Sequence, residues 1–108
     1  MSETLVRVQT LVSEGEVQVS RHGFRELAAD GILVDEVLGG VGSAILVEDY
    51  PTSRKEPSVL VLQRDRVGRP IHVMWGVPNH AGTPAILVTA YRPAPERWSV
   101  DFMRREER

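Results

Sequence analysis

The spacing of apolar residues changes from a helical period to a strand period near residue 41, and this change constrains the fold most. Before it, apolar side chains recur three and four residues apart, as in segment 3–14. After it, short apolar runs alternate with turns rich in Pro, Gly and Asn. Helices followed by strands indicate an α+β domain in which the helices cover one face of a sheet.

Two or three short helices are expected over about residues 3–39. The first covers 3–14, the second begins after the N-cap residue Ser20 and ends at Gly31, and a third fits Val34–Leu38. Residues Glu16–Val19 are predicted to connect the first two helices. All three helices are short, so each depends on packing against the sheet.

Four strands are expected over about residues 43–92. They are Ala44–Tyr50, Ser58–Arg64, Ile71–Val77 and Ala85–Arg92. Proline after Tyr50 and after Arg92 marks strand ends, because proline cannot donate to a sheet ladder. Short connections between successive strands favour a four-stranded antiparallel meander.

The charged tail 96–108 is expected to be a short helix or partly disordered. The whole chain has 108 residues and no cysteine, which corresponds to a single domain without disulfides or thiol chemistry. The N-terminal residues have no continuous apolar run of the kind found in signal peptides or membrane spans. We therefore expect a soluble, cytoplasmic protein without a membrane partner.

Charge is distributed unevenly along the chain. Residues 1–50 carry three basic and nine acidic residues, whereas residues 51–108 carry ten basic and six acidic ones. Twelve of the thirteen basic residues are arginine, the better bidentate phosphate ligand, which would suit RNA. The codon bias of a GC-rich genome explains the same arginine content.

Alternation along the strands predicts which side chains share a face. In the third strand His72 lies on the face opposite Trp75. In the fourth strand Leu87, Thr89 and Tyr91 are expected to share one face. Both faces are apolar in the middle, so the pattern does not decide which face the helices cover.

A set of short fragments runs in order through about residues 3–100. They are Ser20-Arg21-His22, Gly31-Ile32, Glu48-Asp49-Tyr50-Pro51, Pro57-Ser58, Gly68-Arg69-Pro70-Ile71-His72-Val73, Thr89-Ala90-Tyr91-Arg92-Pro93 and Trp98. In this order and spacing the chain resembles a family of short bacterial proteins described as a domain of unknown function. Glu26 and Asp30 depart from it, because relatives often carry basic residues at those positions.

The resemblance implies a fold and an activity. The family is grouped with the barnase, EndoU, colicin and RelE type of ribonuclease toxin fold, in which helices precede a four-stranded antiparallel sheet. It implies an endoribonuclease toxin acting on RNA. It also implies an antitoxin encoded nearby, in some cases with a small zinc-binding domain.

Metal-independent RNA cleavage needs a base for the 2′-hydroxyl, an acid for the leaving oxygen and cations for the phosphate. Histidine titrates nearest neutrality. The candidate acid–base pair is His22 and His72. The candidate phosphate- or RNA-binding residues are Arg64, Arg92, Tyr91 and Thr89.

Structural roles for the same residues stay open. His22 fits a partner for a neighbouring carboxylate, and His72 fits a half-buried ring bonded to a backbone carbonyl. Arg92 fits an ion pair with Glu48 or Asp49. The three histidines lack short metal-ligand spacing and no glycine-rich phosphate loop is recognised, so neither a metal nor a cofactor is expected.

The alternative function is a non-catalytic protein-binding domain of the same fold, either a degenerate toxin or a subunit of a homo- or hetero-complex. The side chains on the open sheet face distinguish the ribonuclease from the protein-binding domain. A basic cleft joining His22, His72 and Arg92 favours the ribonuclease. An exposed apolar face with Met74 or Trp75 favours the binding domain.

Overall fold

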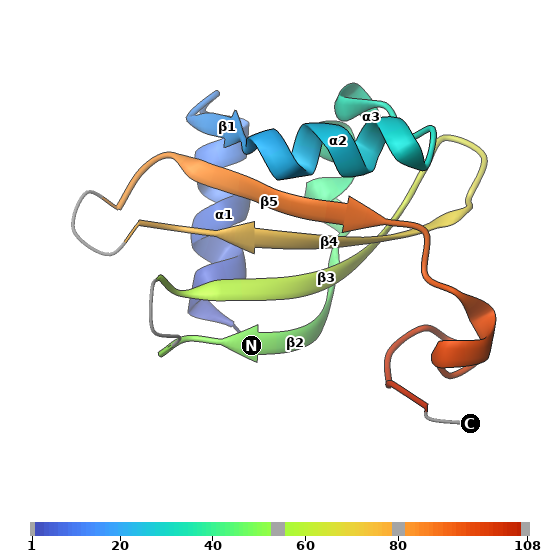
Figure 1. The fold of residues 1–108 in the computed structure, drawn as a ribbon. Helices are drawn as coiled ribbons and strands as arrows, with labels where there is room; N and C mark the ends of the chain where they lie inside the picture. Colours follow the sequence, from blue (N-terminus) through green and yellow to red (C-terminus); the bar gives the residue numbers. More distant parts are fainter. Residues whose placement is uncertain (1, 53–55, 79–81, 107–108) are drawn as a thin grey trace.

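The computed structural model describes residues 2–52, 56–78 and 82–106. Its three helices and the four longer strands follow the expected order along the chain, with one additional short strand between the first two helices (Figure 1). The helices are α1 (Glu3–Ser13), α2 (Arg21–Ala29) and α3 (Val34–Gly40), and the strands are β1 (Val17–Val19), β2 (Ile45–Tyr50), β3 (Ser58–Arg64), β4 (Pro70–Gly76) and β5 (Ala85–Tyr91). Within these residues, no helix is both long and apolar enough to cross a membrane.

The sheet has five strands in the order β1-β5-β4-β3-β2. Strands β2 to β5 form the expected antiparallel meander. The additional strand β1 pairs with β5 in parallel, so the sheet is mixed and not purely antiparallel. The prediction that Glu16–Val19 is only a connector was wrong. Three residues are too few to show an alternating pattern, and the partner segment Ala85–Leu87 lies far away in the sequence.

Helix α2 begins and ends as its sequence predicts. The hydroxyl of Ser20 accepts a hydrogen bond from the backbone N–H of Gly23, and Gly31 after the helix has a φ of 64°. A Cβ on Gly23 would lie 2.8 Å from the carbonyl oxygen of Leu87. The helix therefore lies against β5 at a distance that only glycine permits.

The main core lies between the sheet and the helices. Its side chains come from one face of β3, β4 and β5, from α1, α2 and α3, and from the 3₁₀ turn Val41–Ser43. Trp75 is fully buried there, and its indole N–H donates to the side chain of Gln63. Gln63 in turn donates to the carbonyl oxygen of Val37 in α3, so this buried amide has partners on both sides.

A β-bulge changes which side chains of β5 share a face. Met74 pairs with Thr89 but Trp75 pairs with Leu87, so Val88 is an extra residue. Leu87 consequently lies in the main core, whereas Thr89 pairs with Met74 on the opposite face. The prediction that Leu87 and Thr89 share a face was wrong, because simple alternation cannot account for an inserted residue.

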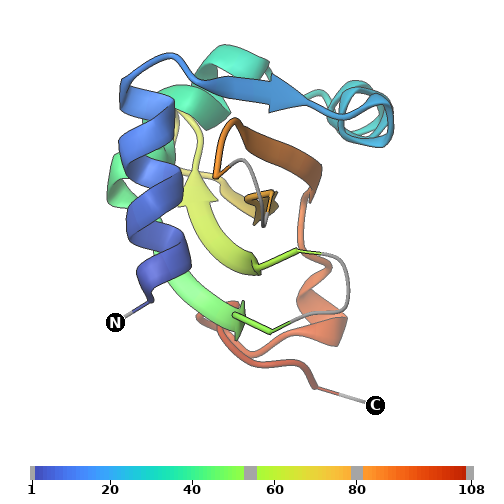
Figure 2. The ribbon, with the colours of Figure 1, turned by 90° about the vertical axis from the view of Figure 1, so that its left-hand side faces the viewer.

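The C-terminal residues cover the sheet face that the helices leave open. Figure 2 shows α1 and the C-terminal segment on opposite sides of the strands. After the 3₁₀ turn Pro95–Arg97, the chain folds back on itself through an antiparallel bridge between Trp98 and Arg105. We call residues Trp98–Arg105 the clasp. It contains no α-helix, in contrast to the helix considered for the tail.

Candidate functional site

His72 lies at the centre of the face beneath the clasp. Its side chain is completely buried. Nδ1 lies 3.3 Å from the hydroxyl oxygen of Tyr91, and Nε2 lies 2.8 Å from the carbonyl oxygen of Phe102. Burial lowers the pKa of His72 below its ordinary value, and the nearby charge of Arg105 acts in the same direction. The imidazole is therefore neutral at neutral pH.

Aromatic rings surround this histidine. The ring of Trp98 meets it edge-on at 4.3 Å between centroids, and the ring of Tyr91 does so at 5.4 Å. Burial raises the pKa of the Tyr91 hydroxyl, which therefore stays protonated at neutral pH. Tyr91 and His72 face each other on neighbouring strands, since they are directly paired in the sheet register.

An ion pair joins the clasp to strand β2. Nε and Nη2 of Arg105 each lie 3.1 Å from an oxygen of Glu48, which makes the pair bidentate. The hydroxyl of Tyr50 also donates to Glu48, at 2.6 Å. The hydrogen bond from Arg105 lowers the pKa of Glu48. The guanidinium of Arg105 also lies 4.8 Å from the centre of the Trp98 ring, within the range of a cation–π contact.

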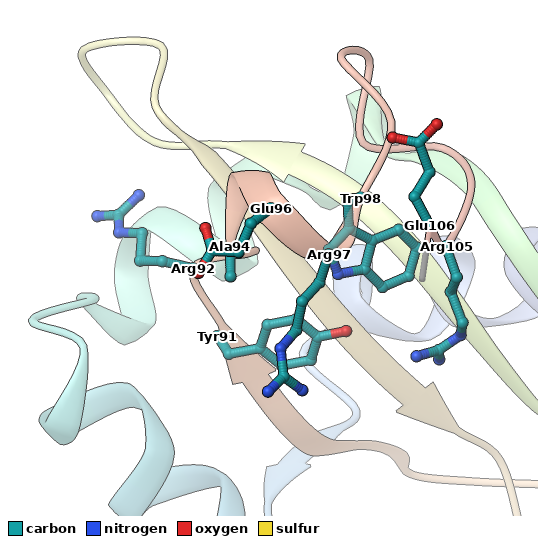
Figure 3. Close-up of a pocket in the computed structure, with 8 residues that line it drawn as sticks. All are labelled: Tyr91, Arg92, Ala94, Glu96, Arg97, Trp98, Arg105 and Glu106. Atoms are coloured by element: carbon teal, nitrogen blue, oxygen red, sulfur yellow. The ribbon is translucent and has the colours of Figure 1, made fainter. Parts of the chain in front are cut away.

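A pocket of about 850 Å³ opens between the end of β5 and the C-terminal segment. Its lining residues are Tyr91, Arg92, Ala94, Glu96, Arg97, Trp98, Arg105 and Glu106. Figure 3 shows Tyr91, Arg97, Trp98 and Arg105 gathered together, whereas the side chains of Arg92 and Glu106 extend away from them. Arg97 and Arg105 therefore line the same pocket as Tyr91, whose hydroxyl is bonded to His72.

The structure does not bring His22 and His72 together. The side chain of His22 is 64% exposed on α2, and its Nε2 lies 3.6 Å from the carboxylate of Glu26. The ring nitrogens of His72 are instead bonded to Tyr91 and to a backbone carbonyl. The third histidine, His80, lies outside the described residues.

The four predicted RNA-binding residues are placed differently from one another. Tyr91 lines the pocket beside His72, and Thr89 lies two residues before it on the same strand. Arg64 is exposed and donates to the carbonyl oxygen of Gly68 within its own turn. Of the four, Tyr91 and Arg92 line the pocket.

Arg92 has a different acidic partner from the two considered in the sequence. Its Nη2 lies 2.9 Å from Asp65, which is only 5% exposed, and its Nη1 donates to the carbonyl oxygen of Pro70. The backbone N–H of Arg92 donates to Asp30. The ion pair with Glu48 or Asp49 was therefore a wrong expectation. The turn that carries Asp65 is brought to the end of β5 by β4.

Sequence reasoning missed three contributors to the site, of which two line the pocket and one contacts His72. They are Arg97, Arg105 and the carbonyl oxygen of Phe102. All belong to the charged tail 96–108, for which a short helix or partial disorder, but no contact with the sheet, was expected from the sequence. The signal available was Trp98, a large apolar residue within that segment and part of the recognised pattern. A buried tryptophan there implies that its neighbours contact the sheet.

The sheet face opposite the helices shows neither the basic cleft joining His22, His72 and Arg92 nor the exposed apolar surface that the sequence suggested. Trp75 is fully buried in the main core, Met74 is half-buried, and the clasp covers the centre of the face. The pocket that is present joins Tyr91 with Arg92, Arg97 and Arg105, and it also contains Glu96 and Glu106 but not His22. Among the described residues, no group of three or more histidine or acidic side chains is arranged to hold a metal ion.

Comparison with protein families identifies one match. The model of the domain of unknown function DUF4258 matches residues 19–92. The chain belongs to the DUF4258 family. No curated protein and no solved structure matches it. The matched segment begins at the end of β1 and stops just after β5, so the clasp lies outside it.

Proposed function

We propose that this DUF4258 protein is a metal-independent endoribonuclease of the toxin-like type, with its site in the pocket beside Tyr91. The observation that carries the proposal is the Tyr91–His72 hydrogen-bonded pair at a pocket that Arg97 and Arg105 also line. A hydroxyl backed by a neutral imidazole is a base, and arginines bind phosphate. This combination is what cleavage of RNA through its own 2′-hydroxyl requires.

The reaction follows from these groups. The oxygen of Tyr91 accepts the proton of the ribose 2′-hydroxyl while its own proton passes to Nδ1 of His72. The 2′-oxygen attacks phosphorus, and the bond from phosphorus to the 5′-oxygen breaks. The 5′-oxygen leaves with the electron pair and takes a proton from water, and the resulting hydroxide removes the proton from Nδ1 of His72. The products are a 2′,3′-cyclic phosphate and a 5′-hydroxyl.

Charged residues around the pocket act on the phosphate and on His72. Arg97 balances the charge that develops on the phosphate oxygens, and Arg105, although paired with Glu48, adds positive charge at the pocket wall. Glu48 favours the protonated form of His72 that arises during the step, whereas Arg105 opposes it. Arg92 is committed to Asp65, and it supports the end of β5 rather than the phosphate.

The partner of such a protein is an antitoxin, as expected for a toxin–antitoxin pair. Covering the pocket would be the simplest way for it to block RNA.

The test uses the purified full chain, a labelled RNA and EDTA in the buffer. We expect cleavage products that end in a 2′,3′-cyclic phosphate. Arg97→Gln should lower kcat/KM at least about tenfold, because it removes a cation from the transition state. Arg25→Gln, an exposed change on α2, is the matched charge control. Equal losses in both variants, or intact RNA with the wild type, would contradict the proposal and favour the protein-binding alternative.

A further inference from the structure

The tip of the clasp has an unusual backbone conformation. Phe102 has a φ of 62°, and among the described residues it is the one non-glycine residue with a positive φ. This conformation is unfavourable for a residue with a Cβ. Backbone strain of this kind persists only where surrounding contacts impose it.

A set of short hydrogen bonds imposes it here. The hydroxyl of Ser99 donates to Asp101 at 2.6 Å, and the backbone N–H of Met103 donates to the same oxygen. The backbone N–H of Arg104 donates to the hydroxyl of Ser99. The turn is therefore closed from both sides of Phe102. The closed turn directs the carbonyl oxygen of Phe102 toward His72, where it lies 2.8 Å from Nε2.

This contact determines where the proton of His72 lies. A carbonyl oxygen only accepts hydrogen bonds, so Nε2 must carry the hydrogen. In the neutral ring Nδ1 then has a lone pair, and it is Nδ1 that faces the hydroxyl of Tyr91. With the other tautomer, Nε2 and Phe102 would both present lone pairs, and Nδ1 could not take the proton of Tyr91.

We propose that the Phe102 carbonyl is a positioning group, which holds His72 as the Nε2–H tautomer and so keeps Nδ1 as the proton acceptor for Tyr91. The catalytic consequence rests on the ribonuclease function proposed above, whereas the tautomer does not. The clasp is thus a working part of the site and not only a cover.

The anchoring of the clasp supports this role. Trp98 packs against His72 at one end of the clasp, and Arg105 binds Glu48 at the other. These two contacts hold the turn over the histidine ring. Because the clasp lies beyond the family match, the positioning group is supplied by a segment outside the matched domain.

If the clasp were only a cover over the sheet face, loosening it would have the opposite effect on RNA cleavage. If the clasp only blocked the face, loosening it would uncover Tyr91 and His72 and raise the rate of RNA cleavage. If the carbonyl positions His72, loosening the turn must lower the rate. Variants of Asp101 separate the two, since this side chain is exposed and acts within the turn.

The experiment records the ¹⁵N NMR signals of the His72 imidazole in the full-length protein, together with kcat and KM for RNA. In the wild type we expect a protonated Nε2 and an unprotonated Nδ1. In Asp101→Ala we expect averaging of the two tautomers and a fall in kcat of about tenfold, with little change in KM. Asp101→Asn keeps the accepting oxygen and should restore both readouts.

Several results would overturn the inference. These are an Nδ1–H tautomer in the wild type, a tautomer that stays unchanged in Asp101→Ala, or a changed tautomer with unchanged kcat. Ser99→Ala loosens the same turn and replaces Asp101→Ala if that variant does not fold. If the wild type cleaves no RNA, the proposed function and the catalytic consequence both fail, while the NMR signals still decide whether Phe102 sets the tautomer.

Discussion

Glu48 and Arg105 form a bidentate ion pair that joins strand β2 to the clasp across 57 residues of sequence. Neither residue would be expected to meet the other from its local sequence. Their pairing places the guanidinium of Arg105 beside Trp98 and on the wall of the pocket. A single contact therefore links the sheet, the clasp and the candidate site.

Replacing Glu48 with glutamine should loosen the clasp without unfolding the sheet. The side chain of Arg105 is 60% exposed, so solvent screens the pair and the loss in unfolding free energy should be no more than about 1 kcal/mol. Hydrogen exchange of the clasp amides should increase more than exchange in β3 and β4. Glu14→Gln, an exposed change after α1, is the control. Uniform acceleration across the sheet would contradict this local role.

Removal of Asp65 should be far more costly. Arg92 is largely buried, and without its partner the charge would be left uncompensated. Asp65→Ala should lower the unfolding free energy in urea denaturation by clearly more than Glu48→Gln does. Asp65→Asn keeps the oxygen that accepts from Val67 and Arg69, so it separates the turn from the ion pair. A loss in unfolding free energy no larger than that of Glu48→Gln would mean that Arg92 is paired weakly.

The close approach of α2 to β5 makes a sharp prediction about two glycines. Gly23→Ala should destabilise the protein by about 2 kcal/mol, because its Cβ would clash with the Leu87 carbonyl. Gly39→Ala, where nothing lies within 4 Å of the new Cβ, should be neutral or stabilising by up to about 1 kcal/mol. Thermal unfolding of the two variants measures the difference. Equal melting temperatures would show that α2 can shift away from the sheet.

The stability of the fold should decrease in mild acid because of His72. Its pKa in the folded state is below the ordinary 6.5, so the unfolded chain binds the extra proton more readily. The stabilisation that neutral, buried His72 gives the folded state is fully present above about pH 6.5 and is lost as the pH falls through the lowered pKa. Glu48, Tyr91 and Arg105 are the titratable groups around the ring. Urea unfolding from pH 5 to pH 7.5 measures the slope, and His72→Gln should flatten it. A wild-type profile that is flat below pH 6.5 would contradict a buried neutral histidine.

Local patterns in the sequence were sufficient for most of the architecture. Strand β3 was predicted with its observed bounds, because alternation and flanking turn residues mark both ends. The caps of α2 are equally local, since Ser20 and Gly31 act within one helical turn. Strand β1 and the bulge at Val88 depend on pairing with distant residues, which no local pattern reveals.

The candidate site was predicted only in part for the same reason. His72 and Tyr91 were both singled out, and the register of β4 with β5 brings them together. The structural alternative for His72 was a half-buried ring bonded to a backbone carbonyl; the carbonyl bond is confirmed, and the ring is completely buried. Its partner Phe102 depends on a turn that forms only when Trp98 is buried on the sheet. The burial of Trp98 is a property of the tertiary structure, which no local sequence pattern reveals.

The most direct test of the ribonuclease proposal is single-turnover cleavage of RNA by Tyr91→Phe, compared with the wild type in EDTA. The substitution removes one oxygen and leaves the ring in place, so the fold should be retained. The account predicts a rate loss of at least about a hundredfold, larger than the loss in His22→Ala, because the hydroxyl transfers the proton. Cleavage at the wild-type rate by Tyr91→Phe would contradict it.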